Sequence, residues 1–383
     1  MSAGYAERLK EYPNKGKCGL PENYDTARSL SSKIRSLAQL MNQSSYTVVL
    51  TGAGISTSAG IPDFRGPNGI WTREQERLKL RKRKRVEGSN NNIYVQNNND
   101  VEQSTANNKN NDKEGGSPSF VTAQPTLTHR ALAHLITSDR PSSNTTTTTA
   151  TKHYLNHIIT QNIDGLHGKT PLPRNQLSIL HGDIFTEKCP ICHTEYIRNY
   201  EISTIGLQPT GRYCEATSCN GALIDTLLDW EDALPEKDWE QSQIECARAE
   251  LILCLGTSLR IEPAGGLCRL GTGVGFVEAR ADEWDLGHGV SAVEEKKQSA
   301  KKTAKKKKGR KRKVPQPKKL GYVIVNLQET PYDDTAALVI RAKVDDVMER
   351  LMFLLGYDND WDEGNDDGVI EIEGGVKEKN EAD

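Results

Sequence analysis

Four cysteines are spaced as metal ligands. Cys189 and Cys192 form a CxxC pair, and Cys214 and Cys219 follow further along the chain with a four-residue gap between them. Two thiol pairs at such a separation are typical of a tetrahedral zinc site. The wider second gap still lets both sulfurs reach one metal if the intervening loop bulges out. Since four cysteines leave no open position for water, we predict one structural Zn2+; a thiol redox motif at CPIC is the alternative.

A glycine-containing loop follows a short apolar run. Residues 48–50 (VVL) are typical of a buried strand, and TGAG, with Gly52, Ala53 and Gly54, ends it. Glycines at this point let the backbone approach a ligand closely. A helix beginning within 55–59 would direct free N–H groups at the loop and favour a phosphate. A tight turn without a ligand is an equal alternative, because the third glycine of the usual dinucleotide fingerprint is missing.

Polar residues also end three other predicted strands, at 154–160, 251–255 and 322–326. They are Gln161, Asn162 and Asp164 after the first, Gly256, Thr257 and Ser258 after the second, and Asn326 and Gln328 at the end of the third. Open parallel sheets bind ligands beyond the carboxyl ends of their strands, so one crevice should collect these residues. We therefore predict an α/β fold: a Rossmann-like parallel sheet with an inserted small zinc module.

Longer strings resemble the sirtuins, the NAD-dependent protein deacylases. They are GAGIS, GIPDFRG and GIW within 52–71, PTLTHRALAHLI at 125–136, QNIDGLH at 161–167, LHG at 180–182, GTSL at 256–259 and NLQ at 326–328. The segments 5–25 and 223–235, the latter with a Trp-containing string, are similar to the nuclear class IV sirtuins of the sirtuin six type. We interpret the 125–136 segment as a packing helix that leaves His129 and His134 on the surface.

The resemblance implies a set of site residues. For NAD+ they are Gly52, Ala53, Gly54, Thr57, Asp63, Phe64, Arg65, Trp71, Gln161, His181, Gly256, Thr257, Ser258, Asn326, Gln328 and Val344. It also implies His181 as the catalytic base, with Asn162 and Asp164 near the nicotinamide and ribose. Asp229, Trp230 and Glu231 would face the acyl-lysine peptide. An unperturbed imidazole titrates near ambient pH, which suits a general base, whereas His167 is expected to be structural.

The activity that the resemblance implies is NAD-dependent removal of an acyl group from lysine, giving nicotinamide and O-acyl-ADP-ribose. Acyl-lysine proteins, histones above all, are the expected substrates. Two alternatives stay open: mono-ADP-ribosyl transfer to protein, and a chromatin-binding scaffold with weak catalysis. The intact polar set after the strand at 154–160 argues against a dead enzyme.

Charge is segregated along the chain. The formal net charge is −2, yet 14 Lys or Arg and no acid lie within 296–319, which leaves −16 for the remainder. This run, and seven basic residues within 77–85, predict nuclear targeting or contact with DNA and chromatin; solvated loops are the alternative. The nucleus is thus the expected location. No apolar run of about 18 residues or secretory signal is visible, so we expect no membrane partner, and the clustered cysteines indicate a reducing compartment.

The predicted organisation has four parts. Residues 1–26 form an N-terminal segment, and a discontinuous Rossmann-like domain spans 27–185 and 221–356. A zinc module occupies 186–220, and an acidic disordered tail covers 357–383. Polar or charged composition predicts disordered insertions near 80–118, 140–151 and 271–318.

Overall fold

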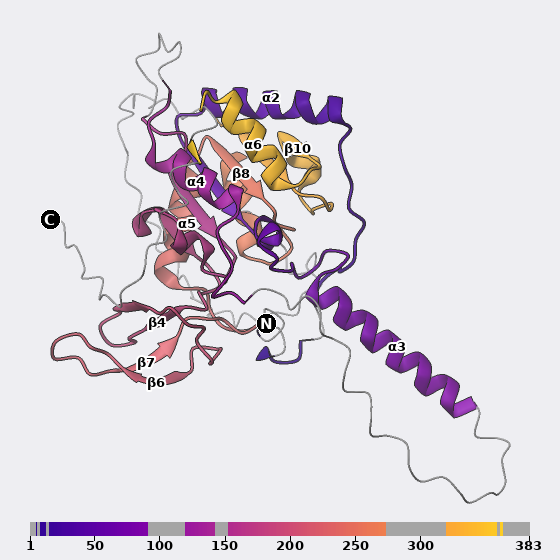
Figure 1. Ribbon diagram of the computed structural model, residues 1–383, viewed down its shortest axis with the longest axis vertical. Coiled ribbons are helices and arrows are strands. Elements are labelled where there is room, and N and C mark those ends of the chain that lie inside the picture. The colour runs from indigo at the N-terminus through magenta and orange to yellow at the C-terminus, as the bar shows by residue number, and fades with distance from the viewer. Residues whose placement is uncertain are drawn as a thin grey trace, which may run out of the picture.

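The computed structural model describes residues 5, 8–12, 15–90, 119–141, 152–272, 319–357 and 361–362; for 83–90 and 271–272 it describes the backbone alone. Most of the three predicted insertions and of the acidic tail lie outside these residues. Figure 1 shows a large α/β part and a smaller β part below it, with one long helix, α3, projecting from the body.

The described elements are as follows. The α-helices are α2 (Ala27–Gln43), α3 (Ile70–Asn90), α4 (Leu127–Thr137), α5 (Glu236–Arg248) and α6 (Val344–Leu354). Short 3-10 helices are η1 (Ala53–Ile55), η2 (Thr57–Ala59), η4 (Leu166–Lys169), η5 (Arg174–Gln176), η6 (Ala264–Thr272) and η7 (Asp333–Thr335). The strands are β1 (Thr47–Thr51), β2 (His157–Thr160), β3 (Leu177–Ile179), β4 (Thr186–Lys188), β5 (Glu195–Ile197), β6 (Pro209–Tyr213), β7 (Ala222–Asp225), β8 (Leu251–Leu255), β9 (Gly321–Val325) and β10 (Leu338–Ile340).

The large sheet confirms the predicted fold class. Its strand order is β10-β9-β8-β1-β2-β3, and every neighbouring pair is parallel. Numbered within this sheet alone, the order is 6-5-4-1-2-3, which is that of the Rossmann fold, and its direction reverses between β1 and β8. The four strands predicted from apolar runs are present, and β3 and β10 extend the sheet at its two edges.

Helices cover both faces of this sheet. One face packs against α2, α4 and α6, and the other against α5 and η6. Alternate residues of each strand point to opposite faces: Val49 of β1 lies in the first core, whereas Val48 and Leu50 lie in the second. The strands are therefore apolar without interruption, as expected for a parallel sheet that is buried on both sides.

The smaller sheet is antiparallel, with the order β5-β4-β7-β6. The strand β7 belongs to this sheet but begins at Ala222, just beyond the predicted end of the zinc module at residue 220. Glu187 of β4 is fully buried and binds Arg198 at 3.1 Å and also Arg212. The two guanidinium groups supply the hydrogen bonds that a carboxylate needs when it is buried.

Three expectations about local structure were wrong. The loop after β1 forms the 3-10 turns η1 and η2 and not an α-helix, and Gly60 with a left-handed φ ends η2. The helix-dipole argument for a phosphate therefore fails, since neither turn is an α-helix. Residues 80–90, predicted as disordered, continue α3. His129 is fully buried, because its side chain closes a capping box with Thr126 at the start of α4.

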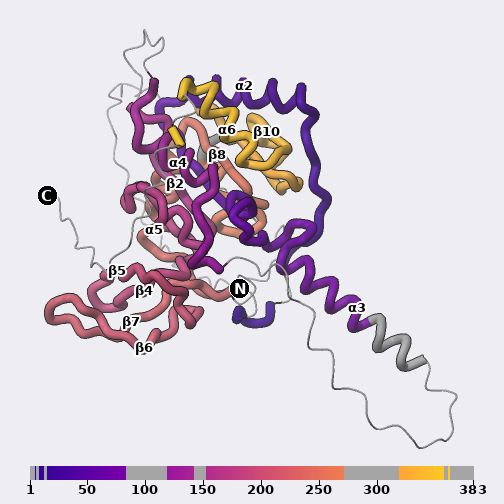
Figure 2. The backbone as a smooth tube through the Cα atoms, viewed as in Figure 1, coloured from indigo at the N-terminus to yellow at the C-terminus, as the bar shows by residue number. Residues whose placement is uncertain are grey.

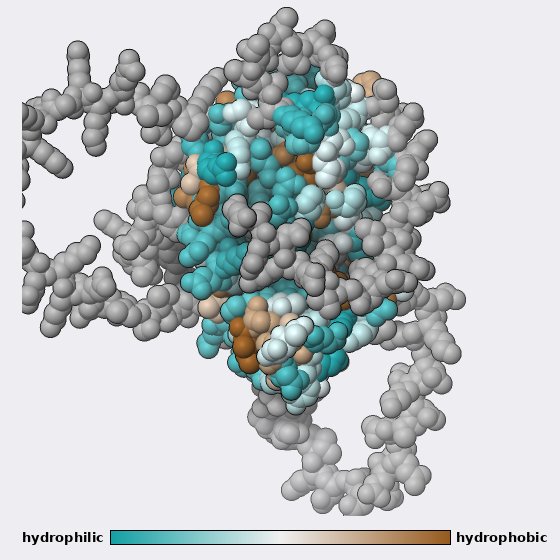
Figure 3. Space-filling view, turned by 90° about the vertical axis from the view of Figure 1, so that its left-hand side faces the viewer, coloured by the Kyte–Doolittle hydropathy of each residue, from teal (hydrophilic) through white to brown (hydrophobic). Residues whose placement is uncertain are grey.

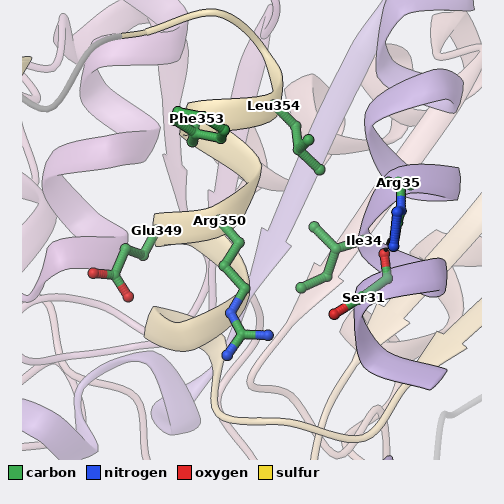
Figure 4. A pocket seen from close by; sticks show the side chains of 7 residues that line it. All are labelled: Ser31, Ile34, Arg35, Glu349, Arg350, Phe353 and Leu354. Atoms are coloured by element: carbon green, nitrogen blue, oxygen red, sulfur yellow. Dashed lines mark hydrogen bonds between the residues drawn. The ribbon is translucent and has the colours of Figure 1, made fainter. Parts of the chain in front are cut away.

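One groove on the described surface lies away from the predicted site. The face shown in Figure 3 is mainly hydrophilic, with small separate hydrophobic patches. A groove of about 320 Å³ lies between α2 and α6, lined by Ser31, Ile34, Arg35, Glu349, Arg350, Phe353 and Leu354 (Figure 4). None of the predicted site residues lines it. No described helix is long and apolar enough to cross a membrane.

Candidate active site and cysteine cluster

Two loops meet where the strand order of the large sheet reverses. The N–H of Gly52, after β1, donates to the carbonyl of Leu255 at 3.0 Å, and the N–H of Gly54 donates to the carbonyl of Gly256 at 2.8 Å. This point of an open α/β sheet is where ligands bind. The structure thus brings together the predicted residues of both loops.

The glycines are required by the contact between these loops. A Cβ on Gly52 would lie 2.7 Å from the Cβ of Thr257, and one on Gly54 would lie 2.8 Å from the Cα of Gly256. Gly256 itself has a φ of +58°, which favours glycine. We expected the glycines to leave room for a ligand, but the direction in which a Cβ would point is filled by the opposite loop.

Gln161 joins the end of β2 to the same place. Its backbone N–H donates to the Thr51 carbonyl at 3.0 Å, and its Nε2 donates to Thr257 Oγ1 at 3.0 Å. Thr257 Oγ1 in turn accepts the N–H of Leu259 at 3.2 Å. Gln161 is therefore fixed by the loop after β8, and Ser258 beside it remains partly exposed.

A buried polar cluster begins at Asn162, the residue after Gln161. The hydroxyl of Ser56 donates to Asp164 Oδ2 at 2.6 Å, and Asn162 Nδ2 donates to Ser56 Oγ at 3.1 Å. Asp164 Oδ1 accepts the N–H of Leu166 at 3.0 Å. Burial raises the pKa of Asp164, while the hydrogen bond from Ser56 lowers it. Ser56 is a central member that we did not predict, although it belongs to the GAGIS string.

His181 follows β3, the neighbour of β2, and is held by Gln161. Its Nδ1 lies 3.0 Å from the Gln161 carbonyl oxygen. A carbonyl only accepts, so Nδ1 carries the hydrogen and Nε2 of the neutral ring is the basic nitrogen. Burial lowers the pKa of His181 to about 4. This corrects our expectation of an unperturbed imidazole, because desolvation favours the neutral ring.

An aromatic cluster connects the predicted cofactor and peptide segments. The ring of Trp71, in the first turn of α3, lies 4.7 Å from Phe64 and 4.9 Å from Trp230. Tyr12 stacks on Trp230 at 4.7 Å, and the Arg65 guanidinium lies 4.4 Å from the Trp71 ring centre. Within the described residues, the buried indole nitrogens of Trp71 and Trp230 have no hydrogen-bond partner. Most buried donors have a partner, so these two nitrogens are exceptions among the described residues.

The acids beside Trp230 differ in their surroundings. Asp229 Oδ1 accepts the N–H of Trp230 at 2.8 Å and that of Lys10 at 3.3 Å, so it holds the N-terminal segment against this loop. Glu231 is exposed. Of the two, Glu231 is the side chain that solvent and a peptide can reach.

The other predicted cofactor residues occupy varied positions. Thr57 is exposed, and Ala53 is partly exposed. Asp63 Oδ1 accepts the N–H of Gly66 at 2.9 Å and so shapes the loop before α3. Asn326 Nδ2 donates to the carbonyl of Gln328 at 2.8 Å. Val344 begins α6 and is buried.

One further residue, Asp183, escaped the sequence reasoning, and His167 was expected to be structural. Asp183 is half-buried, and burial raises its pKa to about 7. His167, expected to be structural, is buried with Nε2 3.2 Å from Thr51 Oγ1 and its ring 4.7 Å from that of His129. No local sequence pattern around Asp183 predicts its raised pKa, because the shift arises from tertiary burial.

The four predicted cysteines converge in the small sheet. Their sulfurs all lie within 4.8 Å of one another, with Cys189 and Cys219 at 3.5 Å and Cys192 and Cys214 at 3.4 Å. None forms a disulfide. Zn–S bonds of about 2.3 Å in a tetrahedron separate the sulfurs by about 3.8 Å, so this set fits one Zn2+.

The reversing Rossmann sheet and the polar cluster at its switch point define a nucleotide-binding class of α/β protein. Comparison with protein families matches residues 52–263 to the Sir2 family, and the chain belongs to that family.

Individual relatives agree with this assignment. The chain is 37% identical over 355 residues to the NAD-dependent protein deacetylase SRT1 of Arabidopsis thaliana, covering 92% of this chain and 55% of that protein. It is 33% identical over 365 residues to the NAD-dependent protein deacetylase Sirt6 of Drosophila melanogaster, covering 94% and 86%. With the NAD-dependent protein deacetylase sirtuin-7 of Homo sapiens it shares 30% over 342 residues, covering 87% and 62%. The chain thus spans about half the length of SRT1.

Proposed function

We propose that this chain is an NAD-dependent protein-lysine deacylase of the class IV sirtuin type. The observation that carries the proposal is the orientation of His181: Nδ1 is fixed on the Gln161 carbonyl, so Nε2 is the basic nitrogen. Gln161 directly precedes Asn162, a member of the Ser56–Asn162–Asp164 cluster. The names of the relatives support the same activity.

The residues at the switch point suit a dinucleotide. The buried indole N–H of Trp71 lacks a partner within the described residues, and Ala53, Ser258 and Asn326 are partly exposed around the two loops. NAD+ would supply an electrophilic ribose carbon that accepts the acyl oxygen once nicotinamide departs. Arg65 stays protonated at pH 7, since burial lowers its pKa only to about 10.

His181 would act as the base. Nε2 of the neutral ring accepts a proton from a ribose hydroxyl, and the Gln161 carbonyl stabilises the imidazolium that forms through the Nδ1–H bond. The lowered pKa of His181 in the protein without ligand keeps its ring unprotonated before the reaction. The products of the proposed reaction would be nicotinamide, free lysine and O-acyl-ADP-ribose.

We further propose one structural Zn2+ on the four cysteines, and chromatin as the setting. Histones are the expected acyl-lysine substrates, and the nucleus the expected location. Five cations on α3 are exposed: Arg73, Arg77, Lys79, Arg81 and Lys82. Such a surface favours a phosphate backbone, with an affinity that falls as salt rises. The lysine-rich run within 296–319 lies outside the described residues.

Mass spectrometry of acylated peptides tests the activity. An acetylated and a long-chain-acylated histone-tail peptide are incubated with and without NAD+, using the wild-type chain, His181→Tyr, and His153→Tyr as a matched control at a site whose Nδ1 binds Ser138. We expect NAD-dependent loss of an acyl group with O-acyl-ADP-ribose formed, abolished in His181→Tyr and retained in the control.

Other results point elsewhere. Consumption of NAD+ with intact peptides and a gain in protein mass would make ADP-ribosyl transfer the function. If NAD+ is not consumed even with nucleosomes, and DNA binding survives His181→Tyr, the chromatin-binding scaffold would be the remaining function. Full activity of a folded His181→Tyr protein would overturn the base assignment.

A further inference from the structure

Residues 15–25, called here the strap, bind two loops that carry predicted cofactor contacts. The N–H of Gly19 donates to the carbonyl of Arg65 at 3.0 Å, in the loop before α3. The N–H of Asn23 donates to the carbonyl of Leu327 at 2.9 Å, in the loop after β9. The strap therefore joins two loops that lie far apart in the sequence.

The side chain of Gln328 connects the same three segments. It is 9% exposed, and its Nε2 donates to the Leu20 carbonyl at 2.6 Å and to the Arg65 carbonyl at 3.3 Å. An amide nitrogen has two hydrogens, so both are directed at carbonyls of this chain. No Nε2 hydrogen is left to bind the cofactor, although the sequence predicted Gln328 as a cofactor contact.

Arg341 holds the other side of the loop after β9. Its Nη1 donates to the carbonyls of Asn326 at 2.9 Å and Gln328 at 2.8 Å, and its Nη2 pairs with the carboxylate of Asp333. Its backbone N–H donates to Asp25 Oδ2 at 2.8 Å, at the end of the strap. One guanidinium thus fixes the backbone on both sides of Leu327.

The position of Arg65 depends on these contacts. Its Nε donates to the carbonyl of Lys15 in the strap at 3.0 Å, while its guanidinium lies over Trp71. The Arg65 carbonyl is held by Gly19 and Gln328. Loss of the strap would release the guanidinium and the carbonyl of Arg65 together.

We propose that Gln328 and Arg341 are positioning residues, which hold the loops of Arg65 and Asn326 in register through the strap. The inference rests on the proposed function, because it concerns the affinity for NAD+. Gln328 acts through the backbone of Arg65, and Arg341 through the backbone of Asn326.

Two measurements on the full chain test Gln328. Gln328→Glu keeps the shape of the side chain but replaces two donors by acceptors facing two carbonyls. Hydrogen exchange of peptides covering 15–25 should accelerate, and NAD+ affinity by calorimetry should fall about tenfold, the effect of losing one to two hydrogen bonds. Affinity for the acylated peptide alone should stay unchanged. Gln208→Glu is the matched control, since its Nε2 also donates to a carbonyl, that of Gly206, in the small sheet.

Arg341→Lys extends the test. A lysine keeps the charge but cannot reach both carbonyls and Asp333 in the forked geometry. We expect a higher KM for NAD+ with kcat nearly unchanged, and no effect of Arg350→Lys in the distant groove. Faster exchange with unaltered NAD+ affinity would show a structural role only and overturn the proposal. Weaker NAD+ binding with the strap still protected from exchange would make Gln328 a direct contact of NAD+, which also overturns the proposal.

If the wild-type chain binds no NAD+, the proposed function itself fails, whereas the exchange data still report whether Gln328 holds the strap.

Discussion

The two parts of this protein are held together by different means. The large domain has two extended cores on opposite faces of its sheet, built from the strands and the helices α2, α4, α5 and α6. The small sheet has a core of four buried residues, Cys189, Tyr196, Cys214 and Leu223, of which two are predicted zinc ligands. Such a core buries little apolar surface, so the small sheet needs another source of stability.

The comparison explains why the parts tolerate different changes. Burial in the large domain is spread over many side chains, and the loss of one costs a few kcal/mol at most. In the small sheet, binding of zinc to the four cysteines would be coupled to folding, because the ion would join segments that few apolar contacts hold together. The small sheet should therefore respond in an all-or-none manner.

Removal of zinc is the strongest test of this difference. A strong chelator, or Cys192→Ser, should unfold the small sheet and leave the large domain folded, because structural zinc contributes about 10–16 kcal/mol to such modules. Metal analysis should give one zinc per chain, and hydrogen exchange should rise within 186–225 only. Cys18→Ser, outside the cluster, is the matched control. Absence of bound metal, or simultaneous unfolding of both parts, would contradict the comparison.

The sequence predicted most of the chemistry but less of its geometry. The apolar strands, the parallel sheet and the cysteine set are local patterns, and all are present in the structure. β3 and β10 are only three residues long, too short for a period to appear, so tertiary pairing alone makes them strands. His129 looked like a surface residue because its burial depends on the side-chain cap at Thr126.

The site shows the same limit. His181, Gln161, Asn162 and Asp164 were named, and the structure brings them together. Neither the tautomer of His181 nor its lowered pKa could be predicted, since both arise from the Gln161 carbonyl and from burial across the sheet. The role of Gln328 was likewise hidden, because its partners Leu20 and Arg65 are remote in sequence.

A smaller effect is expected where the two loops of the large domain touch. Gly54→Ala would place a methyl group 2.8 Å from the Gly256 Cα, so the loops must separate. Overpacking of this kind costs about 1–3 kcal/mol, and denaturant unfolding of the large domain should show it together with weaker NAD+ binding. Gly168→Ala, with nothing within 4 Å of the added Cβ, should leave both unchanged. Equal effects of the two substitutions would show that loop contact is not what these glycines provide.

Acid should lower the stability of the large domain and of the small sheet through different titratable groups. Of the effects predicted here, we expect the change per residue to be the smallest. Burial lowers the pKa of His157 and His167 to about 4 in the large domain, whereas His193 in the small sheet is exposed. A histidine of ordinary pKa in the unfolded chain binds more protons than the folded one between pH 6.5 and 4, so stability falls as the pH drops through this window. Each such histidine changes the free energy of unfolding by about 1.4 kcal/mol per pH unit. Asp183, whose pKa is raised, has the opposite effect and offsets one histidine.

Denaturant unfolding at pH 5, 6 and 7 measures how the free energy of unfolding depends on pH. His157→Gln should reduce this slope by the amount that corresponds to one bound proton. Added zinc should restore the small sheet at low pH but not this slope, because protonation of a buried imidazole does not depend on the metal. A slope unchanged by His157→Gln would mean that the pKa of this ring is the same in the folded and unfolded chain, and the acid sensitivity of the large domain would then come from other groups, His167 among them.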